Sequence, residues 1–316
     1  MQPIRVMLVI LMCAIAGLAA ASTLYVNQAG TDPQSPYTTP ATAALTIQDA
    51  VDAAAAGDRI EVAPGNYTST AGDVAFIENK AISLVGAGPD AVVVDGQGAR
   101  RGIRTLMQSA SGDLRIEGLT ITNAVTAGSG GGIHARWMGP ETGSLTLDNV
   151  VITDCQSGSA GGGGLHFDPN LPVSLIVTNC SIRDNRADNG PGGGILIGTK
   201  VADTSLIVDS ELIGNETGSG SGGGIQVYGP VTLRNTLIAE NTAGGHGGGV
   251  VSSSGHVTLE NCVIRDNYGG YGGGVYVTAQ ATLIIQRQYC YIYRRNTHDD
   301  LFLHHPAGAA GRYGEY

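Results

Sequence analysis

The sequence has very little lysine, and its basic residues are outnumbered by its acidic ones. Lys80 and Lys200 are the only lysines, and the chain carries 17 basic against 27 acidic residues, for a net charge of −10. Removal of Arg5 with an N-terminal leader leaves 16 basic residues and a net charge of −11 (16 − 27). Proteins that bind nucleic acid or anionic membranes present clustered basic residues. The composition therefore excludes a nucleic-acid partner and favours a soluble acidic surface.

Paired cysteine motifs are also lacking. No C-x-x-C pattern is present, which argues against a cysteine metal site. Cys155, Cys180 and Cys262 lie in the repeated part of the chain, and the last two occupy equivalent positions three repeats apart. Stacked strands at ~4.8 Å would hold them roughly 14 Å apart, beyond disulfide reach. We expect all three to be small buried side chains.

Long hydrophobic runs are confined to the N-terminus. Arg5 precedes an almost wholly apolar stretch from Val6 to Ala20, and Ala19 to Ala21 supply the small residues of a cleavage site. This pattern predicts a secretory signal peptide over residues 1–21, with an uncleaved membrane anchor as the alternative. The mature chain is then expected to have no integral membrane span and to be extracellular or at the outer membrane or cell surface.

Glycine, by contrast, is abundant, at 49 of 316 residues against a usual ~7%. Because there is no Gly-x-y period, collagen is excluded. Instead, six glycine triplets are each followed by one aliphatic residue: Ile133, Leu165, Ile195, Ile225, Val250 and Val275. Spacings of 25 to 32 residues between these positions indicate one structural unit stacked on copies of itself.

Each repeat contains three short segments in which aliphatic residues alternate with polar ones, which is typical of strands. One segment follows the glycines, and the other two form a leucine column and an isoleucine column. The leucine column comprises Leu147, Val177, Val208, Leu233 and Leu259, and the isoleucine column comprises Ile152, Ile182, Ile213, Ile238 and Ile264. Three strands per repeat with no room for a helix predict an all-β fold, a single-stranded parallel β-helix with three strands per coil.

Asparagines recur at two further positions of the repeat. We expect them at the bends, because asparagine tolerates left-handed backbone and its amide can bond its copy on the next coil. The expected ladders comprise Asn149, Asn179, Asn235 and Asn261 at one bend, and Asn185, Asn241 and Asn267 at the other, where Cys155 and Glu216 fill the remaining coils and Asn215 falls one place early. The glycine triplets are expected at a third bend, where a side chain would collide with neighbouring coils.

The residues before the repeats predict an N-terminal cap over 22–66. Thr46 is a candidate helix N-cap with Asp49 three residues later, and Gly57 ends a helix of about 46–56. The strand Arg59–Val62 follows. Coils are expected over 67–285, after which the repeat pattern stops. Residues 286–316 then form either a frameshifted tail or a C-terminal cap in which Leu301–Leu303 covers the last coil.

Several segments resemble known proteins. Gly57 to Tyr67, Leu45 to Val51 and Ile82 to Gly88 are similar to the N-terminal cap and first coils of right-handed parallel β-helix proteins of the pectin-lyase-like superfamily. The later coils, which pair a glycine-rich tetrapeptide with Ile-x-x-Asn, resemble polymorphic outer membrane protein repeats. The resemblance implies a right-handed solenoid. It does not imply one activity, because the superfamily includes lyases, glycosidases and adhesins.

Outward-facing residues are the candidates for chemistry. The residue after each triplet's aliphatic should point out, which gives a row of His134, His166, Leu196, Gln226, Val251 and Tyr276. His134 and His166 should be neighbours and, with Asp168, form a possible metal site; two solvated histidines are the alternative. An acidic column of Asp154, Asp184, Glu240 and Asp266 is a possible Ca²⁺ site or a solvated edge. No other cofactor is expected.

The longest insertion, His134 to Ser144, contains the only tryptophan. Trp137, with Phe167 on the next coil and Tyr276 further along, is a candidate for stacking on sugar rings. A tryptophan folded over the tube is the alternative. His246, within a Gly-His-Gly sequence, resembles a polygalacturonase motif, but the carboxylate motifs of that family do not surround it.

These observations favour a secreted or cell-surface β-helix protein with an adhesive, structural or glycan-contacting role and no catalysis. Its expected partner is a cell-surface or extracellular polysaccharide. The alternative is a polysaccharide lyase or glycoside hydrolase, for which charged side chains should converge across three adjacent coils.

Overall fold

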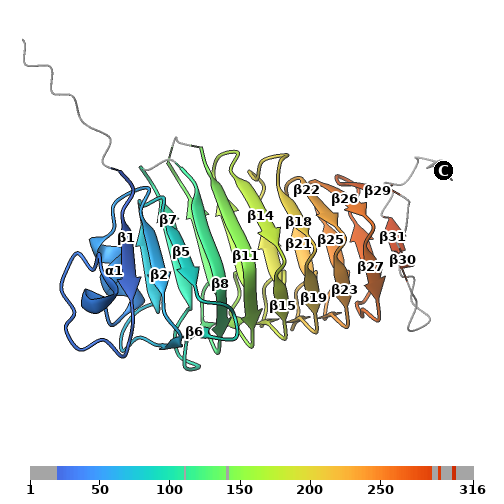
Figure 1. The fold of residues 1–316 in the computed structure, drawn as a ribbon. Coiled ribbons are helices and arrows are strands. Elements are labelled where there is room, and N and C mark those ends of the chain that lie inside the picture. Colours follow the sequence, from blue (N-terminus) through green and yellow to red (C-terminus); the bar gives the residue numbers. More distant parts are fainter. Residues whose placement is uncertain (1–19, 110–111, 140–141, 287–290, 293–300, 304–316) are drawn as a thin grey trace, which may run out of the picture.

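The computed structural model describes residues 20–109, 112–139 and 142–286, together with the backbone of 291–292 and 301–303. Within these residues the chain winds into an elongated solenoid of parallel strands (Figure 1). The predicted all-β fold is confirmed. The expected signal peptide lies outside the described residues, except for its last two, and so does most of the expected tail.

One sheet runs along the side of the solenoid that follows the glycine triplets, and we call it the glycine-side sheet. All its neighbouring strands pair in parallel and in register, for example Ile133 with Leu165 and Leu165 with Ile195. Its nine strands are β4 (Ala75–Glu78), β7 (Ile103–Met107), β10 (Ile133–Trp137), β13 (Leu165–Pro169), β17 (Ile195–Ile197), β21 (Ile225–Val227), β25 (Val250–Ser252), β28 (Val275–Val277) and β31 (Leu301–Leu303).

A second sheet of seventeen strands carries both the leucine and the isoleucine columns. The long strands β8 and β11 contribute to both, and in later coils a bend divides them into two strands. The strands are β1 (Thr23–Val26), β2 (Arg59–Val62), β3 (Gly65–Tyr67), β5 (Ser83–Gly86), β6 (Val92–Asp95), β8 (Leu114–Thr122), β11 (Ser144–Thr153), β14 (Ser174–Thr178), β15 (Ser181–Arg183), β18 (Leu206–Val208), β19 (Glu211–Ile213), β22 (Val231–Arg234), β23 (Leu237–Ala239), β26 (His256–Glu260), β27 (Val263–Arg265), β29 (Thr282–Gln286) and β30 (Tyr291–Ile292).

A third, narrow sheet adds a fourth segment to five coils beyond the three that the sequence predicted. Its two-residue strands lie between the isoleucine segment and the glycine triplet, and they were too short to show a periodicity. They are β9 (Val125–Thr126), β12 (Gln156–Ser157), β16 (Arg186–Ala187), β20 (Glu216–Thr217) and β24 (Thr242–Ala243).

The N-terminal end carries the expected helix, α1 (Ile47–Ala53), and a short 3-10 turn, η1 (Pro40–Thr42). The hydroxyl of Thr46 accepts a hydrogen bond from the Asp49 backbone N–H, as a helix N-cap does. The helix ends at Ala53, earlier than Gly57. Ile47, Ala50 and Val51 are buried in the core, so the helix covers one end of the hydrophobic tube.

The predicted columns are correct in register except in one coil. Ile207, and not Val208, pairs with Val177 and Leu233; Leu212, and not Ile213, pairs with Ile182 and Ile238. Because side chains alternate along a strand, this one-residue shift places Ile207 and Leu212 inside the solenoid and leaves Val208 and Ile213 half-exposed. Both candidates in each column are aliphatic, so hydropathy did not distinguish them. By the same shift, the asparagine columns in this coil contain Asp209 and Asn215 in place of Ser210 and Glu216.

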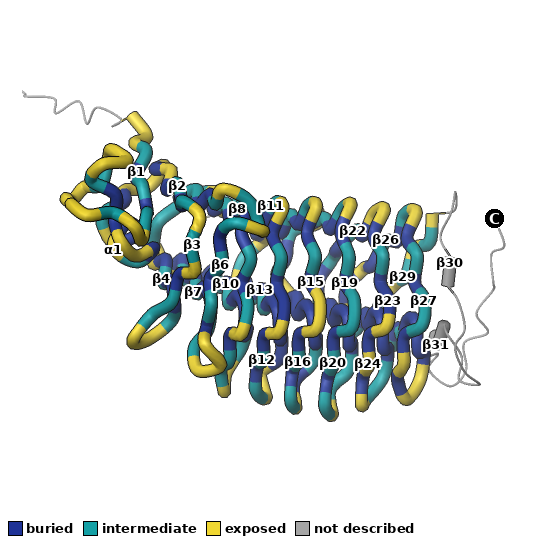
Figure 2. The backbone as a smooth tube through the Cα atoms, turned by 60° about the horizontal axis from the view of Figure 1, so that its bottom comes forward, coloured by how far each residue is buried: buried dark blue, intermediate teal, exposed yellow. Residues whose placement is uncertain are grey.

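The core is a continuous tube of aliphatic side chains, and exposed residues are concentrated at the bends and in the N-terminal loops (Figure 2). The glycine triplets form a tight bend, as predicted. Gly192 has a φ of 68°, and a Cβ on Gly193 or Gly194 would lie 2.5 or 2.6 Å from a carbonyl oxygen of the next coil. A side chain at the last two glycines would therefore separate the coils.

The two asparagine ladders differ in burial. Asn185, Asn215, Asn241 and Asn267 are buried, and each amide bonds the next at 2.9 to 3.0 Å. Asn149, Asn179, Asn235 and Asn261 are exposed, with φ between 49° and 53°. Cys155 begins the buried ladder, and its backbone N–H donates to Asn185 Oδ1 at 3.0 Å.

The cysteines of the coils are buried, as predicted, and burial raises the pKa of the Cys155 thiol to about 12 and that of Cys180 to about 11. Cys180 and Cys262 lie three coils apart in one column, separated by Ser210 and Thr236. No helix in the described part of the chain has the length and hydropathy needed to cross a membrane.

Candidate functional site

The outer face of the glycine-side sheet holds the predicted outward row, and the row extends further towards the N-terminus. Arg104 of β7 precedes His134, and Phe76 of β4 precedes Arg104. His134 pairs with His166 in register, as predicted, and their rings stack with centroids 5.3 Å apart. The row points away from the core, since the alternate residues of the same strands, such as Ile133 and Ala135, face inward. Leu196, Gln226 and Val251 in the middle of the row are nevertheless buried, at 5%, 5% and 2% exposed.

Charged side chains gather around the two histidines in what we call the Arg–His cluster. On one side of the cluster, the Asp73 carboxylate lies 3.0 Å from Arg101 Nη1 and 2.6 Å from Arg104 Nε. On the other side, Arg136 Nε lies 3.4 Å from Asp168 Oδ2. The cluster consists of Asp73, Arg101, Arg104, His134, Arg136, His166 and Asp168.

The arginines of the cluster have different roles. Arg101 is largely buried and donates hydrogen bonds to the backbone oxygens of Ser129 and Gly130, so it fixes the glycine bend. The Arg104 guanidinium lies 3.8 Å over the Phe76 ring. Within the described residues, the Nε atoms of Arg104 and Arg136 have no hydrogen-bond partner, because their ion pairs lack the required alignment. These Nε atoms are buried, but the side chains are 39% and 42% exposed, so a ligand would reach their outer N–H donors.

Both histidines are held neutral. Burial, followed by the positive charges of its neighbours, lowers the pKa of His134 to about 3. Burial likewise lowers the pKa of His166 to about 4, although the Asp168 carboxylate opposes the shift. Every charged group that acts on His134 is a cation or the second histidine. The local potential is therefore positive, on a protein whose net charge is −10.

A depression of about 570 Å³ opens beside the cluster. It is lined by Asp73, Arg100, Arg101 and Thr126, together with small residues of the neighbouring loops. Arg100 donates to Gln97 Oε1 and to the Thr70 backbone oxygen, so its guanidinium is positioned at the rim. The depression brings a fourth arginine to this part of the surface.

A group of aromatic rings, which we call the aromatic cluster, lies at the C-terminal end of the row. Tyr276 stacks on His246, with ring centroids 4.7 Å apart, and Tyr271 lies 5.1 Å from the same imidazole. Tyr271 is 56% exposed. His246 stands directly before a glycine triplet, at the bend. The cluster consists of His246, Tyr271 and Tyr276.

The predicted role of Trp137 and Phe167 is wrong. Trp137 is 1% exposed and Phe167 is completely buried, and their rings meet edge to face inside the solenoid. β10 extends to Trp137, so Trp137 has the same inward parity as Ile133 and Ala135 and is not part of a loop. Neither ring is accessible to a sugar.

The predicted metal ligands are close in the fold, but they are not arranged around one point. Asp168 faces Arg136, and the described part of the chain contains no group of three or more histidine, cysteine, aspartate or glutamate side chains suited to a metal ion. The residues of the acidic column lie at bends, because Asp154, Asp184, Glu240 and Asp266 all have φ between 53° and 59°. Gly214 occupies this position in the coil between those of Asp184 and Glu240.

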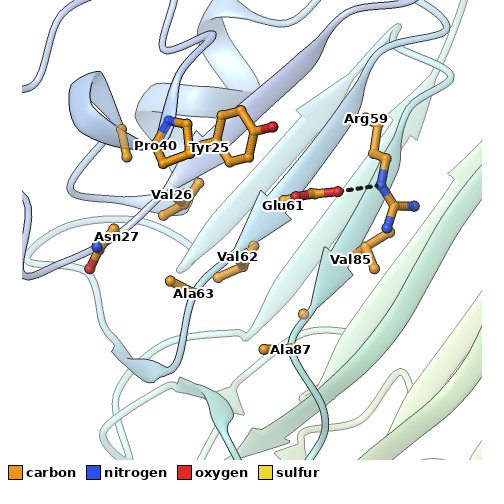
Figure 3. Close-up of a pocket in the computed structure, with 12 residues that line it drawn as sticks. Tyr25, Val26, Asn27, Pro40, Arg59, Glu61, Val62, Ala63, Val85 and Ala87 are labelled. Carbon is orange, nitrogen blue, oxygen red and sulfur yellow. Dashed lines mark hydrogen bonds and ion pairs between the residues drawn. The ribbon is translucent and has the colours of Figure 1, made fainter.

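A pocket of about 330 Å³ lies on the seventeen-stranded sheet near the N-terminal cap (Figure 3). Tyr25, Pro40 and Val85 give it an apolar wall. Its two charged residues, Arg59 and Glu61, neutralise each other at 3.0 Å. It lacks polar groups that converge on a ligand, so the Arg–His cluster is the better candidate site.

Sequence reasoning missed Asp73, Arg104 and Arg136. Arg104 and Phe76 precede the first glycine triplet, so the row that was read from the triplets began two coils too late. Arg136 is two residues beyond His134 on the same strand and therefore on the same face. Applying strand parity along β10 would have found it.

The stacked parallel coils define a parallel β-helix protein. The chain belongs to the family described as the right handed beta helix region, which matches residues 101–289, more than half of the chain. No curated protein and no solved structure matches the chain. The finer resemblances, to the pectin-lyase-like superfamily and to polymorphic outer membrane proteins, stay predictions.

Proposed function

We propose that this is a secreted or cell-surface β-helix protein that contacts glycans through its outer surface without transforming them. The observation that carries the proposal is the aromatic cluster, in which Tyr271 is exposed and backed by the stacked pair of His246 and Tyr276. Aromatic rings with an apolar face and a polar tip suit sugar rings, which also have both characters. The leader-like residues 1–21 support secretion.

A glycan array tests this proposal, with Tyr271→Ala as the variant and Tyr268→Ala as the matched control. Tyr268 is 55% exposed but belongs to no ring contact among the described residues. Loss of one stacking ring should weaken binding about three- to tenfold. Tyr268→Ala should bind as the wild type does. A folded wild-type protein that retains no glycan, or equal losses in both variants, would contradict the proposal.

The second candidate function is a polysaccharide lyase or glycoside hydrolase, and the Arg–His cluster is the observation that favours it. Charged side chains converge there across four adjacent coils, β4, β7, β10 and β13. The carboxylates do not suit glycoside hydrolysis: Asp73 and Asp168 lie three coils apart, roughly 14 Å at ~4.8 Å per coil, whereas such pairs lie roughly 5 to 9.5 Å apart. Turnover of uronate or neutral glycans, assayed with and without Ca²⁺, would establish the enzyme instead.

A further inference from the structure

We propose that the Arg–His cluster is a binding site for an oxyanion, a carboxylate or sulfate group, held between Arg104, His134, Arg136 and His166. This site is separate from the aromatic cluster. His166 and Tyr276 lie four strands apart in the same row, roughly 19 Å at ~4.8 Å per strand. The inference does not depend on glycan stacking at the aromatic cluster.

The four side chains share one face at close spacing. Arg104, His134 and His166 are successive members of one row, each directly opposite the next. Arg136 lies two residues after His134 on β10 and so projects from the same side. A ligand over His134 therefore lies beside the other three side chains at once.

The hydrogen-bonding capacity of these groups is largely unused. The buried atoms Arg104 Nε, Arg136 Nε and His166 Nδ1 have no hydrogen-bond partner within the described residues. A guanidinium presents a planar fork of N–H donors that matches carboxylate and sulfate oxygens, and a neutral imidazole adds one further donor. The side chain of Arg104 is 39% exposed and that of Arg136 is 42% exposed, so both are accessible.

The charges nearby favour an anion over a cation. Four arginines (100, 101, 104 and 136) face two carboxylates, those of Asp73 and Asp168, at the cluster and its adjoining depression. Asp73 is held by two arginines. Asp168 is the competing internal anion, because its contact with Arg136 is long and poorly aligned. An incoming oxyanion with better alignment would take over the Arg136 donors.

Titration calorimetry of the full chain with inorganic sulfate, galacturonate, an acidic oligogalacturonate and a neutral oligosaccharide tests the site. Binding of free sulfate and galacturonate alone would identify a small-anion site, and much tighter binding of the oligomer would identify a glycan-borne anion. We expect the neutral oligosaccharide not to bind at this site. A wild-type protein that binds none of the three anions would overturn the proposal.

Three variants test the site, and we expect one to weaken anion binding, one to leave it unchanged and one to tighten it. Arg136→Gln should weaken anion binding at least about tenfold, because a charge-assisted bond is lost. Arg234→Gln is the matched control, because Arg234 is similarly exposed and paired with Glu260 but lies on the other sheet. The anion affinity of this variant should equal that of the wild type. Asp168→Asn should tighten anion binding several-fold, because it removes the competing carboxylate. If Asp168 were instead a metal ligand together with His134 and His166, Asp168→Asn would remove that ligand and would not tighten anion binding. Weaker anion binding in Asp168→Asn, or equal losses in Arg136→Gln and Arg234→Gln, would refute the oxyanion site.

Discussion

The two asparagine ladders occupy neighbouring bends of the same coils, yet they stabilise the structure in different ways. In the buried ladder, each amide donates to the carbonyl of the preceding coil and to the next amide, as Asn215 does to Ile182 and Asn241. In the exposed ladder, the side chains bond one another or a neighbouring aspartate in contact with water, at distances from 2.9 Å, for Asn235 Nδ2 to Asp209 Oδ1, to 3.4 Å, for Asn179 Nδ2 to Asp148 Oδ1. The first ladder contributes through its side chains, and the second through its tolerance of left-handed backbone.

The largest expected effect comes from breaking the buried ladder. Asn241→Ala removes bonds to Leu212 and Asn267 and leaves the Asn215 backbone N–H without its acceptor. At about 1 to 3 kcal/mol for each buried group left unpaired, the free energy of unfolding should fall by about 3 to 5 kcal/mol. Urea denaturation measures it. Asn179→Gly, at the exposed ladder, should change stability by only a few tenths of a kcal/mol; similar losses at both positions would contradict the distinction.

The histidine pair adds a third case to the comparison of the buried and exposed ladders, because these polar side chains point outward and are nevertheless largely buried. The folded-state pKa values of about 3 for His134 and about 4 for His166 lie below the unfolded value of 6.5. The unfolded chain therefore binds protons first as the pH falls, so stability is complete above pH 6.5 and declines towards pH 4. The expected slope is about 1.4 kcal/mol per pH unit for each histidine.

Denaturation at pH 7 and pH 5 checks this slope in the wild type and in the double variant His134→Gln, His166→Gln. The double variant should lose most of the difference between the two pH values. His256→Gln, at an exposed position of β26, should keep it. A double variant with the wild-type pH dependence would show that these imidazoles are not held neutral.

The smallest expected effect concerns backbone conformation alone. Glu240 has a φ of 59° in a column that elsewhere contains Asn123, Asp154 and Gly214. Asparagine accepts this conformation more readily than glutamate does, so Glu240→Asn should stabilise the fold by about 0.5 kcal/mol. The ion pair that is lost, Glu240 with Arg265 at 3.6 Å, is exposed and weak. A lower midpoint of urea unfolding would contradict the backbone argument.

The sequence predicted the repeat, the inward columns and the Thr46 helix cap because each depends on local alternation or on a local hydrogen bond. It failed where the choice was between adjacent aliphatic residues, as at Leu212 and Ile213, and where a strand continued into an apparent insertion, as at Trp137. The Arg–His cluster was missed for another reason. Its ion pairs join residues about one coil apart, such as Asp73 and Arg101, and only the exact register brings those residues together.

Register is therefore the claim on which both the core and the outer row depend, and the coil of β18 and β19 tests it most directly. Leu212 is buried and Ile213 is half-exposed, although they are adjacent and similar in size. The measurement is the free energy of unfolding of Leu212→Asp and of Ile213→Asp. We predict that Leu212→Asp loses more than about 4 kcal/mol or fails to fold, because it buries a carboxylate, and that Ile213→Asp stays within about 1 kcal/mol of the wild type. A tolerated Leu212→Asp with an unfolded Ile213→Asp would contradict the register, and with it the outer row.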